Sequence, residues 1–168
     1  MAMTAIDDLL LKLIETGRQA SAEEVAAIIA HVVQAPFATY LSRVPINLRQ
    51  LLAQKGISVP VRLSSLERHL FKRIYDEQQW PIGTTADDYI RDLHKVVAHP
   101  SVQIWTYRYF AQAFVGFLAP SHVQKALKPE SHIFVVYSPD YQTLTTGYQA
   151  SGSNRIFTSE YTDLVRHQ

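Results

Sequence analysis

Cysteine is absent from the chain, and long apolar runs are absent as well. Without cysteine there is no disulfide, no thiolate nucleophile and no cysteine-ligated zinc or iron–sulfur site. The longest apolar runs, such as residues 26–33 with His31 among them, are far shorter than the ~20 residues that a membrane span needs. Asp7 and Asp8 stand where a signal peptide would be basic. We therefore expect no membrane segment and a cytoplasmic location.

The signature motifs of several large enzyme classes are missing too. The chain contains no P-loop, dinucleotide-binding fingerprint, G-x-S-x-G elbow, kinase motif or zinc-protease helix motif. Asp88 and Asp92 are four residues apart and could share a helix face with a histidine. However, His94 and His99 are five apart, which is a poor spacing for one face. We expect neither a metal ion nor another cofactor.

What the chain does contain is the composition of a folded domain. Its 168 residues are 47% hydrophobic and 18% charged, without the charge excess that marks disorder. We expect a single domain over residues 1–168 and an α+β fold. Residues 1–99 are predicted to be mainly helical, and residues 100–168 to form a small antiparallel sheet with short helices. The helical half would pack on that sheet.

Apolar residues at helical spacing, together with capping residues, predict the helices of the first half. A first helix covers residues 6–14 and is closed by Gly17. A second begins at the capping box of Ser21 and Glu24 and stops before Pro36. Further helices are expected at residues 46–54, from Ser64 through residue 74, and from residues 84–85 to residue 99.

β-Branched and aromatic residues dominate after Pro100 and favour strands. Strands are predicted at residues 102–110, 114–118, 133–137 and 144–150, the last two forming a hairpin around the turn at residues 138–141. Residues 114–118 could instead continue the strand at residues 102–110, and this region also fits a helix. Short helices are expected at residues 121–127 and from Ser159 onward.

Positive charge is concentrated between Arg43 and Arg73. This stretch holds seven arginine and lysine residues and one acid, Glu67, although the whole chain has a net charge of only +1. A basic stripe of this kind can attract phosphate backbones, or it can simply be a solvated helix face. The candidate nucleic-acid-binding residues are Arg62, Arg68, Lys72 and Arg73, with Trp105 as a base-stacking side chain.

The last predicted strand ends in Thr145-Thr146-Gly147-Tyr148. Because side chains alternate along a strand, Thr146 and Tyr148 lie on one face, with a glycine between them. Such a glycine often marks a bulge or the close approach of another group. Two hydroxyls beside it could receive a ligand, although threonine and tyrosine are also ordinary strand residues.

Arginine and histidine residues in the same region could complete a site. Arg108 shares a predicted strand face with Thr106 and offers a planar cation suited to phosphate, or it packs as a surface cation–π partner. His94 and His99 are the nearest candidates for a general acid or base, and His122 or His132 could be a second. His31 and His69 lie within helical patterns, which favours packing or surface roles. Metal-independent RNA cleavage needs such a set: a base, an acid and groups that stabilise the charged phosphate.

The order of elements after residue 90 resembles the compact ribonuclease toxins grouped as barnase–EndoU–colicin–RelE-like. It comprises a histidine near a helix end, a strand with an arginine, a short helix, the strand at residues 133–137, a turn and Thr-x-Tyr. In some of those domains a histidine, an arginine, a threonine and a tyrosine form the site. The resemblance implies RNA as the substrate, an inhibitor protein as a partner, and the residues His94 or His99, Arg108, Thr146 and Tyr148. The alternative is a non-catalytic binding or regulatory module on the same scaffold.

Overall fold

The helices and strands follow one another along residues 3–168, the part of the chain that the structure, a computed structural model, describes. In the first half they are α1 (Ala5–Thr16), α2 (Ala22–Val32), β1 (Leu41–Arg43), α3 (Ile46–Gln54), β2 (Arg62–Ser64), α4 (Ser65–Phe71), the π-helical turn η1 (Lys72–Asp76) and α5 (Ala86–Val97). In the second half they are β3 (Gln103–Tyr109), β4 (Gln112–Pro120), β5 (His132–Ser138), β6 (Thr143–Ala150), the 3₁₀ turn η2 (Ser153–Arg155) and β7 (Tyr161–Arg166).

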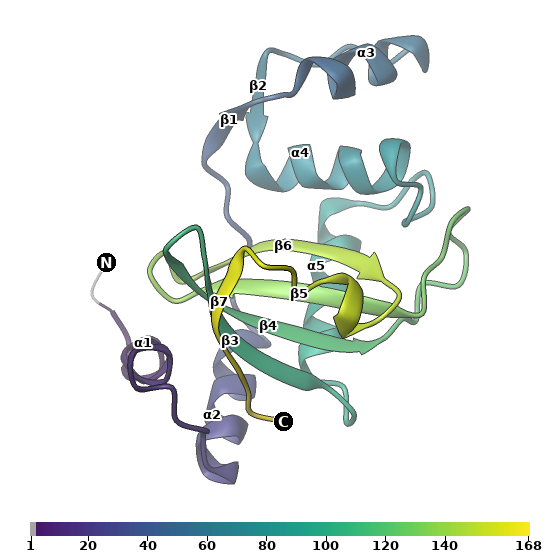
Figure 1. The fold of residues 1–168 in the computed structure, drawn as a ribbon. Coiled ribbons are helices and arrows are strands. Elements are labelled where there is room, and N and C mark those ends of the chain that lie inside the picture. Colours follow the sequence, from purple (N-terminus) through teal and green to yellow (C-terminus); the bar gives the residue numbers. More distant parts are fainter. Residues whose placement is uncertain (1–2) are drawn as a thin grey trace.

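An antiparallel sheet with the strand order β6-β5-β4-β3-β7 forms the centre of the molecule (Figure 1). A second, two-stranded sheet pairs β1 with β2. Helices and antiparallel sheets therefore occur together, and the predicted α+β class is confirmed. The predicted hairpin of β5 and β6 is confirmed as well, because His132 to Ser138 pair with Ala150 to Thr143.

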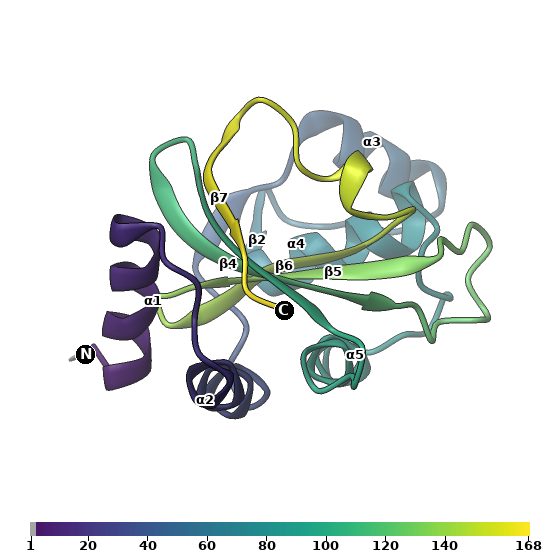
Figure 2. The same ribbon diagram turned by 60° about the horizontal axis from the view of Figure 1, so that its bottom comes forward.

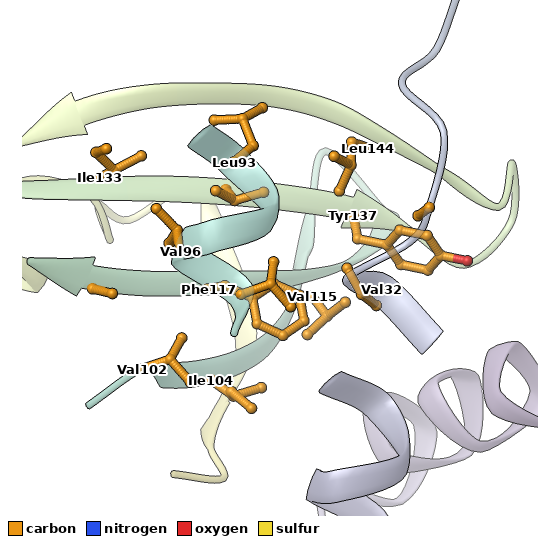
Figure 3. Close-up of a cluster of buried hydrophobic side chains, with 14 of the residues drawn as sticks. Val32, Leu93, Val96, Val102, Ile104, Val115, Phe117, Ile133, Tyr137 and Leu144 are labelled. Carbon is orange, nitrogen blue, oxygen red and sulfur yellow. The ribbon is translucent and has the colours of Figure 1, made fainter. Parts of the chain in front are cut away.

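The helices α1, α2 and α5 cover one face of the large sheet (Figure 2). Leu93 and Val96 of α5 and Val32 of α2 lie over Ile104, Phe117 and other apolar side chains of the strands (Figure 3). Each of these five side chains is almost completely buried. Burial of a large apolar side chain stabilises a fold by about 1.5–3 kcal/mol, so this interface is the main core of the protein.

Side-chain caps explain where these helices begin. The Thr4 hydroxyl oxygen accepts a hydrogen bond from the backbone amide of Asp7 at 3.2 Å. Ser21 and Thr85 each form a reciprocal capping box with the acidic residue three positions later. A cap of this kind contributes about 1 kcal/mol to helix stability. The predicted starts of the second and fifth helices are confirmed.

The opposite face of the large sheet carries a second, aromatic cluster. Tyr107 and Phe134 are buried there beneath Phe157, which lies between η2 and β7, and Tyr161, the first residue of β7. Figure 2 shows this C-terminal segment lying across the sheet on the side away from α1, α2 and α5. The aromatic face also carries Tyr148, whose ring lies 5.7 Å from that of Phe134.

The segment from β1 to η1, residues 41–76, folds as a small lobe beside the free edge of β6 (Figure 1). Val44, Leu48, Leu52 and Leu63 form its own apolar core. Seven arginine and lysine residues and two acids lie in this stretch, so we call it the basic lobe. Its last part, α4 with η1, is attached to β6 by side-chain contacts described below.

The prediction of two short helices in the second half of the chain is wrong. The segment from Ser159 onward forms β7, because its residues pair with the edge of β3 that would otherwise be unpaired. Residues 121–131 form turns and irregular backbone. There the amide of Ser121, the expected helix cap, donates to the carbonyl oxygen of Ser131 at 2.9 Å and so extends the pairing of β4 with β5. In both places strand pairing outweighed the local helix signal.

Candidate active site

A β-bulge in β6 decides which side chains face the aromatic side of the sheet. Tyr137 pairs with Leu144 and Val136 pairs with Thr146, so Thr145 is an extra residue in β6. Leu144 points into the helix-covered core. Thr146 and Tyr148 lie opposite Val136 and Phe134, on the aromatic face. The bulge thus turns the hydroxyl of Thr146 away from the core and onto the same face as Tyr148.

Gly147 points the other way, toward α5. A Cβ atom at this position would lie 2.8 Å from Leu93 Cδ1 and closer still to Cδ2. The glycine therefore permits the close approach of α5 to β6. Its carbonyl oxygen, on the free edge of the sheet, accepts hydrogen bonds from Arg73 Nε at 2.7 Å and from the Tyr89 hydroxyl at 2.5 Å.

The same edge of β6 is covered along its length by polar partners. Leu144 exchanges backbone hydrogen bonds with Pro36 and Ala38, and the side-chain amide of Gln79 bonds both the amide and the carbonyl group of Gln149. An open strand edge is a template for pairing with another chain. These contacts, made by the segments on either side of the basic lobe, close that edge of β6.

His69 and Arg73 reach β6 from the end of the basic lobe. They are four residues apart, His69 on α4 and Arg73 on the π-helical turn η1, in which the amide of Glu77 bonds the carbonyl oxygen of Lys72 at 2.9 Å. A spacing of four places both side chains on one side of the helix. π-Helical turns are rare and are often found at functional sites.

Both side chains converge on the hydroxyl of Thr146. Arg73 Nη2 donates to Thr146 Oγ1 at 2.8 Å, and His69 Nδ1 lies 3.2 Å from the same oxygen. Arg73 Nη1 donates to Glu77 at 2.5 Å, and the guanidinium carbon lies 5.4 Å from the centre of the Tyr148 ring. Arg73 is only 4% exposed, so it joins the basic lobe to β6 from inside the protein. The cluster of His69, Arg73, Thr146 and Tyr148 is the candidate site.

Burial and neighbouring charge set the protonation states in this cluster. Burial, followed by the positive charges of Arg73, Arg68 and Lys72, lowers the pKa of His69 to about 3. Burial also raises the pKa of Tyr148, and the neighbouring Tyr161 hydroxyl adds to the effect. Near neutral pH the histidine is therefore uncharged and the tyrosine keeps its proton. In these states the imidazole can accept a hydrogen bond at one ring nitrogen and the phenol can donate one.

The structure brings together only two of the five residues predicted to be catalytic, Thr146 and Tyr148. Arg108 lies on β3, separated from β6 by β4 and β5, or by about 14 Å at ordinary strand spacing. It also lies on the face of Ile104, which is buried against the helices, whereas Thr146 lies on the aromatic face. Arg108 instead forms an ion pair with Asp163 of β7 at 3.2 Å. The structure therefore does not bring Arg108 together with Thr146 and Tyr148.

His94 and His99 do not reach Thr146 either. His94 Nε2 contacts the carbonyl oxygen of Ala35 at 2.8 Å under the helix-covered face, and His99 Nδ1 accepts the amide of Ser101 at 2.9 Å. His122, in the loop after β4, contacts Asp92, and His132, the first residue of β5, contacts Ser131. These histidines were favoured because they are close to the strands in the chain. The residue that meets Thr146 is His69, 77 positions away.

The predicted nucleic-acid-binding residues divide into two groups. Arg62 and Lys72 are exposed on the basic lobe, and Arg68 bonds Ser42 at 2.9 Å beside them. Arg73 belongs to the site itself. Trp105 is on β3, within the aromatic cluster, where its ring contacts that of Phe157 and the guanidinium of Arg166. Trp105 is therefore part of the aromatic face of the large sheet and not of the basic lobe.

Within residues 3–168, no group of three histidine, cysteine, aspartate or glutamate side chains is arranged to hold a metal ion. No helix of this described part is long and apolar enough to cross a membrane. No protein-family model, curated protein or solved structure matched the chain.

Proposed function

We propose that the protein is a metal-independent endoribonuclease of the toxin type, with His69, Arg73, Thr146 and Tyr148 as its site. One observation carries the proposal: His69 and Arg73, from the basic lobe, converge on the Thr146 hydroxyl beside Tyr148. These residue types are the set that the resemblance to barnase–EndoU–colicin–RelE-like toxins implies. His69 and Arg73 take the places first given to His94 or His99 and Arg108.

Hydrogen-bond roles in the cluster follow from Arg73, which can only donate. Its N–H occupies one lone pair of Thr146 Oγ1. When His69 carries its proton on Nδ1, it donates to the second lone pair, and Nε2 keeps an available lone pair. The Thr146 O–H then remains to donate to a ligand oxygen. Arg73 acts as a positioning residue in this arrangement, since it orients Thr146 without contacting the substrate.

The proposed reaction is general acid–base transesterification. Neutral His69 takes the proton of a ribose 2′-hydroxyl, and the 2′-oxygen attacks the adjacent phosphorus. The bond between phosphorus and the 5′-oxygen breaks, and Tyr148 donates the proton that this leaving oxygen needs. The Thr146 hydroxyl and the nearby positive charge of Arg73 stabilise the phosphate as its negative charge develops. The products are a 2′,3′-cyclic phosphate and a 5′-hydroxyl end.

The basic lobe supplies the attraction for RNA in this proposal. Arg62 and Lys72 are exposed on it, and Arg43 and Lys55 add further exposed cations. Phosphate contacts of this kind give affinity without sequence preference and weaken as salt rises. Since an active ribonuclease would damage the cell that makes it, the proposal also includes an inhibitor protein that covers the site.

The burial of Arg73 supports a second candidate function. Its guanidinium already bonds Gly147, Glu77 and Thr146, which is also how a purely structural clamp between the basic lobe and β6 would look. On that basis the protein would be a binding or regulatory module for RNA or a protein partner. It would bind RNA without changing it.

Incubation of the purified protein with total RNA in excess chelator separates the two functions. The proposal predicts fragments with 2′,3′-cyclic phosphate and 5′-hydroxyl ends. It also predicts a roughly 10²–10⁴-fold slower reaction for Tyr148→Phe, the contribution typical of a general acid. Intact RNA that nevertheless shifts on a native gel would support the binding module instead. Products with 5′-phosphate ends would exclude the proposed chemistry.

A further inference from the structure

A cavity of about 560 Å³ opens on the aromatic side of the sheet, next to the candidate site. Tyr40 in the connection from α2 to β1 lines it, together with Gln112 and Phe114 at the start of β4, Tyr141 in the turn before β6, and Thr143 and Thr145 of β6. Its volume lies within the range of about 300–1,000 Å³ that small-molecule sites occupy.

The cavity adjoins the candidate site through the bulge of β6. Thr145, the extra residue of the bulge, lines the cavity, and Thr146, the next residue, receives His69 and Arg73. The other side of the cavity leads to the basic lobe, since the carbonyl oxygen of Tyr40 accepts the amide of Ser65 at 2.8 Å, at the start of α4. A ligand in the cavity would therefore lie beside both the site and the cations of the lobe.

The lining combines aromatic rings with neutral polar groups and contains no charged side chain. Tyr40 and Tyr141 are 61% and 69% exposed, so their rings are available for stacking. Gln112 is exposed, and its side-chain amide offers both a donor and an acceptor to the cavity. Unpaired RNA bases are recognised by such groups, through stacking on aromatic rings and hydrogen bonds to the base edge.

The turn before Gln112 holds an unusual backbone. Phe110 and Ala111, which join β3 to β4, have φ angles of 48° and 65°, a region that residues other than glycine rarely adopt. The two-residue turn directs Gln112 into the cavity lining and leaves Phe110 76% exposed.

We infer that this cavity binds one unpaired base of a single-stranded RNA, next to the phosphate that the site would cleave. The inference rests on the proposed function and names its substrate as single-stranded. The neutral aromatic cavity suits the planar, uncharged base of a nucleotide. The cations of the basic lobe and of the proposed site suit its anionic phosphate. A paired base could not enter, since its edge is occupied by its partner.

The test measures binding without cleavage. A short mixed-sequence RNA with 2′-O-methyl groups cannot be cleaved, and versions of it can carry an abasic site at each position in turn. Fluorescence anisotropy would report the affinity of the whole protein for every version. Base stacking contributes about 5- to 150-fold in affinity, so one abasic position should weaken binding of the wild-type protein by about tenfold.

Two variants and a control locate the effect. Tyr40→Ala and Tyr141→Ala should bind the intact oligonucleotide about tenfold more weakly and should no longer distinguish it from the abasic version. Leu127→Ala removes an equally exposed side chain, 74% exposed, from the loop at the other end of β4, and should behave like the wild type. Equal binding of all abasic versions by the wild type, or no binding of any oligonucleotide, would overturn the inference.

Failure of the inference can be told apart from failure of the proposed function. If total RNA is cleaved but the abasic scan shows no sensitive position, the ribonuclease stands and the base site falls. If the scan shows a position that depends on Tyr40 and Tyr141 but total RNA stays intact, the base site stands and catalysis falls.

Discussion

His69 offers a direct test of the electrostatics of the site. Its pKa is lowered to about 3 by burial and by Arg73, Arg68 and Lys72. In the unfolded chain the same group would titrate near its ordinary value of about 6.5. Replacement by glutamine, which is neutral at every pH and keeps a hydrogen-bonding group near Thr146, removes this difference.

The sign of the effect follows from proton uptake. Below about pH 6.5 the unfolded chain binds a proton at His69 that the folded chain does not bind, so falling pH favours unfolding. The stabilisation is complete above pH 6.5 and is lost as the pH falls toward the folded value of about 3. With one pKa unit worth 1.36 kcal/mol, the loss from this group between about pH 7.5 and about pH 5 is about 2 kcal/mol.

Urea unfolding of the wild type and of His69→Gln at both pH values would measure this loss. The free energy of unfolding of the wild type should fall by about 2 kcal/mol more than that of the variant. His167, whose pKa is also lowered, chiefly by burial, is present in both proteins and cancels in the comparison. Identical pH dependence in the two proteins, or a His69 imidazole signal that titrates near pH 6.5, would refute the reasoning.

Three further substitutions test the packing of the site. Gly147→Ala should lower the free energy of unfolding in urea by about 1–3 kcal/mol, since its Cβ would overlap Leu93, and the double change with Leu93→Ala should cost less than the sum of the two. Arg73→Lys should lower the free energy of unfolding by about 2–4 kcal/mol, because lysine cannot reproduce the forked contacts of a buried guanidinium. Arg108→Ala, which breaks only a partly exposed pair with Asp163, should change stability by less than about 1 kcal/mol and leave RNA cleavage as it is. A stable Arg73→Lys or an inactive Arg108→Ala would each contradict the geometry of the site.

The elements that the sequence predicts well are those with strong local signals. The capping boxes of α2 and α5 and the apolar spacing behind them determine those helices without help from distant residues. The hairpin of β5 and β6 likewise combines a buried apolar strand with a turn rich in polar residues. In such segments the local preference and the final packing agree.

The elements that the sequence misses depend on pairing between distant residues. β7 is short and mostly exposed, so it lacks the alternation of a half-buried strand, and it exists because β3 needs a partner. β1 and β2 have only three residues each and are set by their pairing with one another. Neither property is visible in a local window of sequence.

The residues of the candidate site were likewise predicted only where the local sequence pattern was sufficient. Alternation along β6 was enough to select Thr146 and Tyr148, but the choice of histidine and arginine depended on which helix packs against the edge of that strand. The spacing of four between His69 and Arg73 was the available signal. It indicated a shared face, and nothing local indicated that the face meets β6. Gly147 was correctly interpreted as a point of close approach, and the group that approaches is Leu93.

The measurement closest to the central claim is a comparison of two histidine variants in the cleavage of a defined single-stranded RNA in excess chelator. We expect His69→Gln to cleave at least about 100-fold more slowly than the wild type, because a general base is lost, and His94→Gln to retain the wild-type rate. Cleavage that survives in His69→Gln but is lost in His94→Gln, or a wild-type protein that leaves the RNA intact, would contradict that claim.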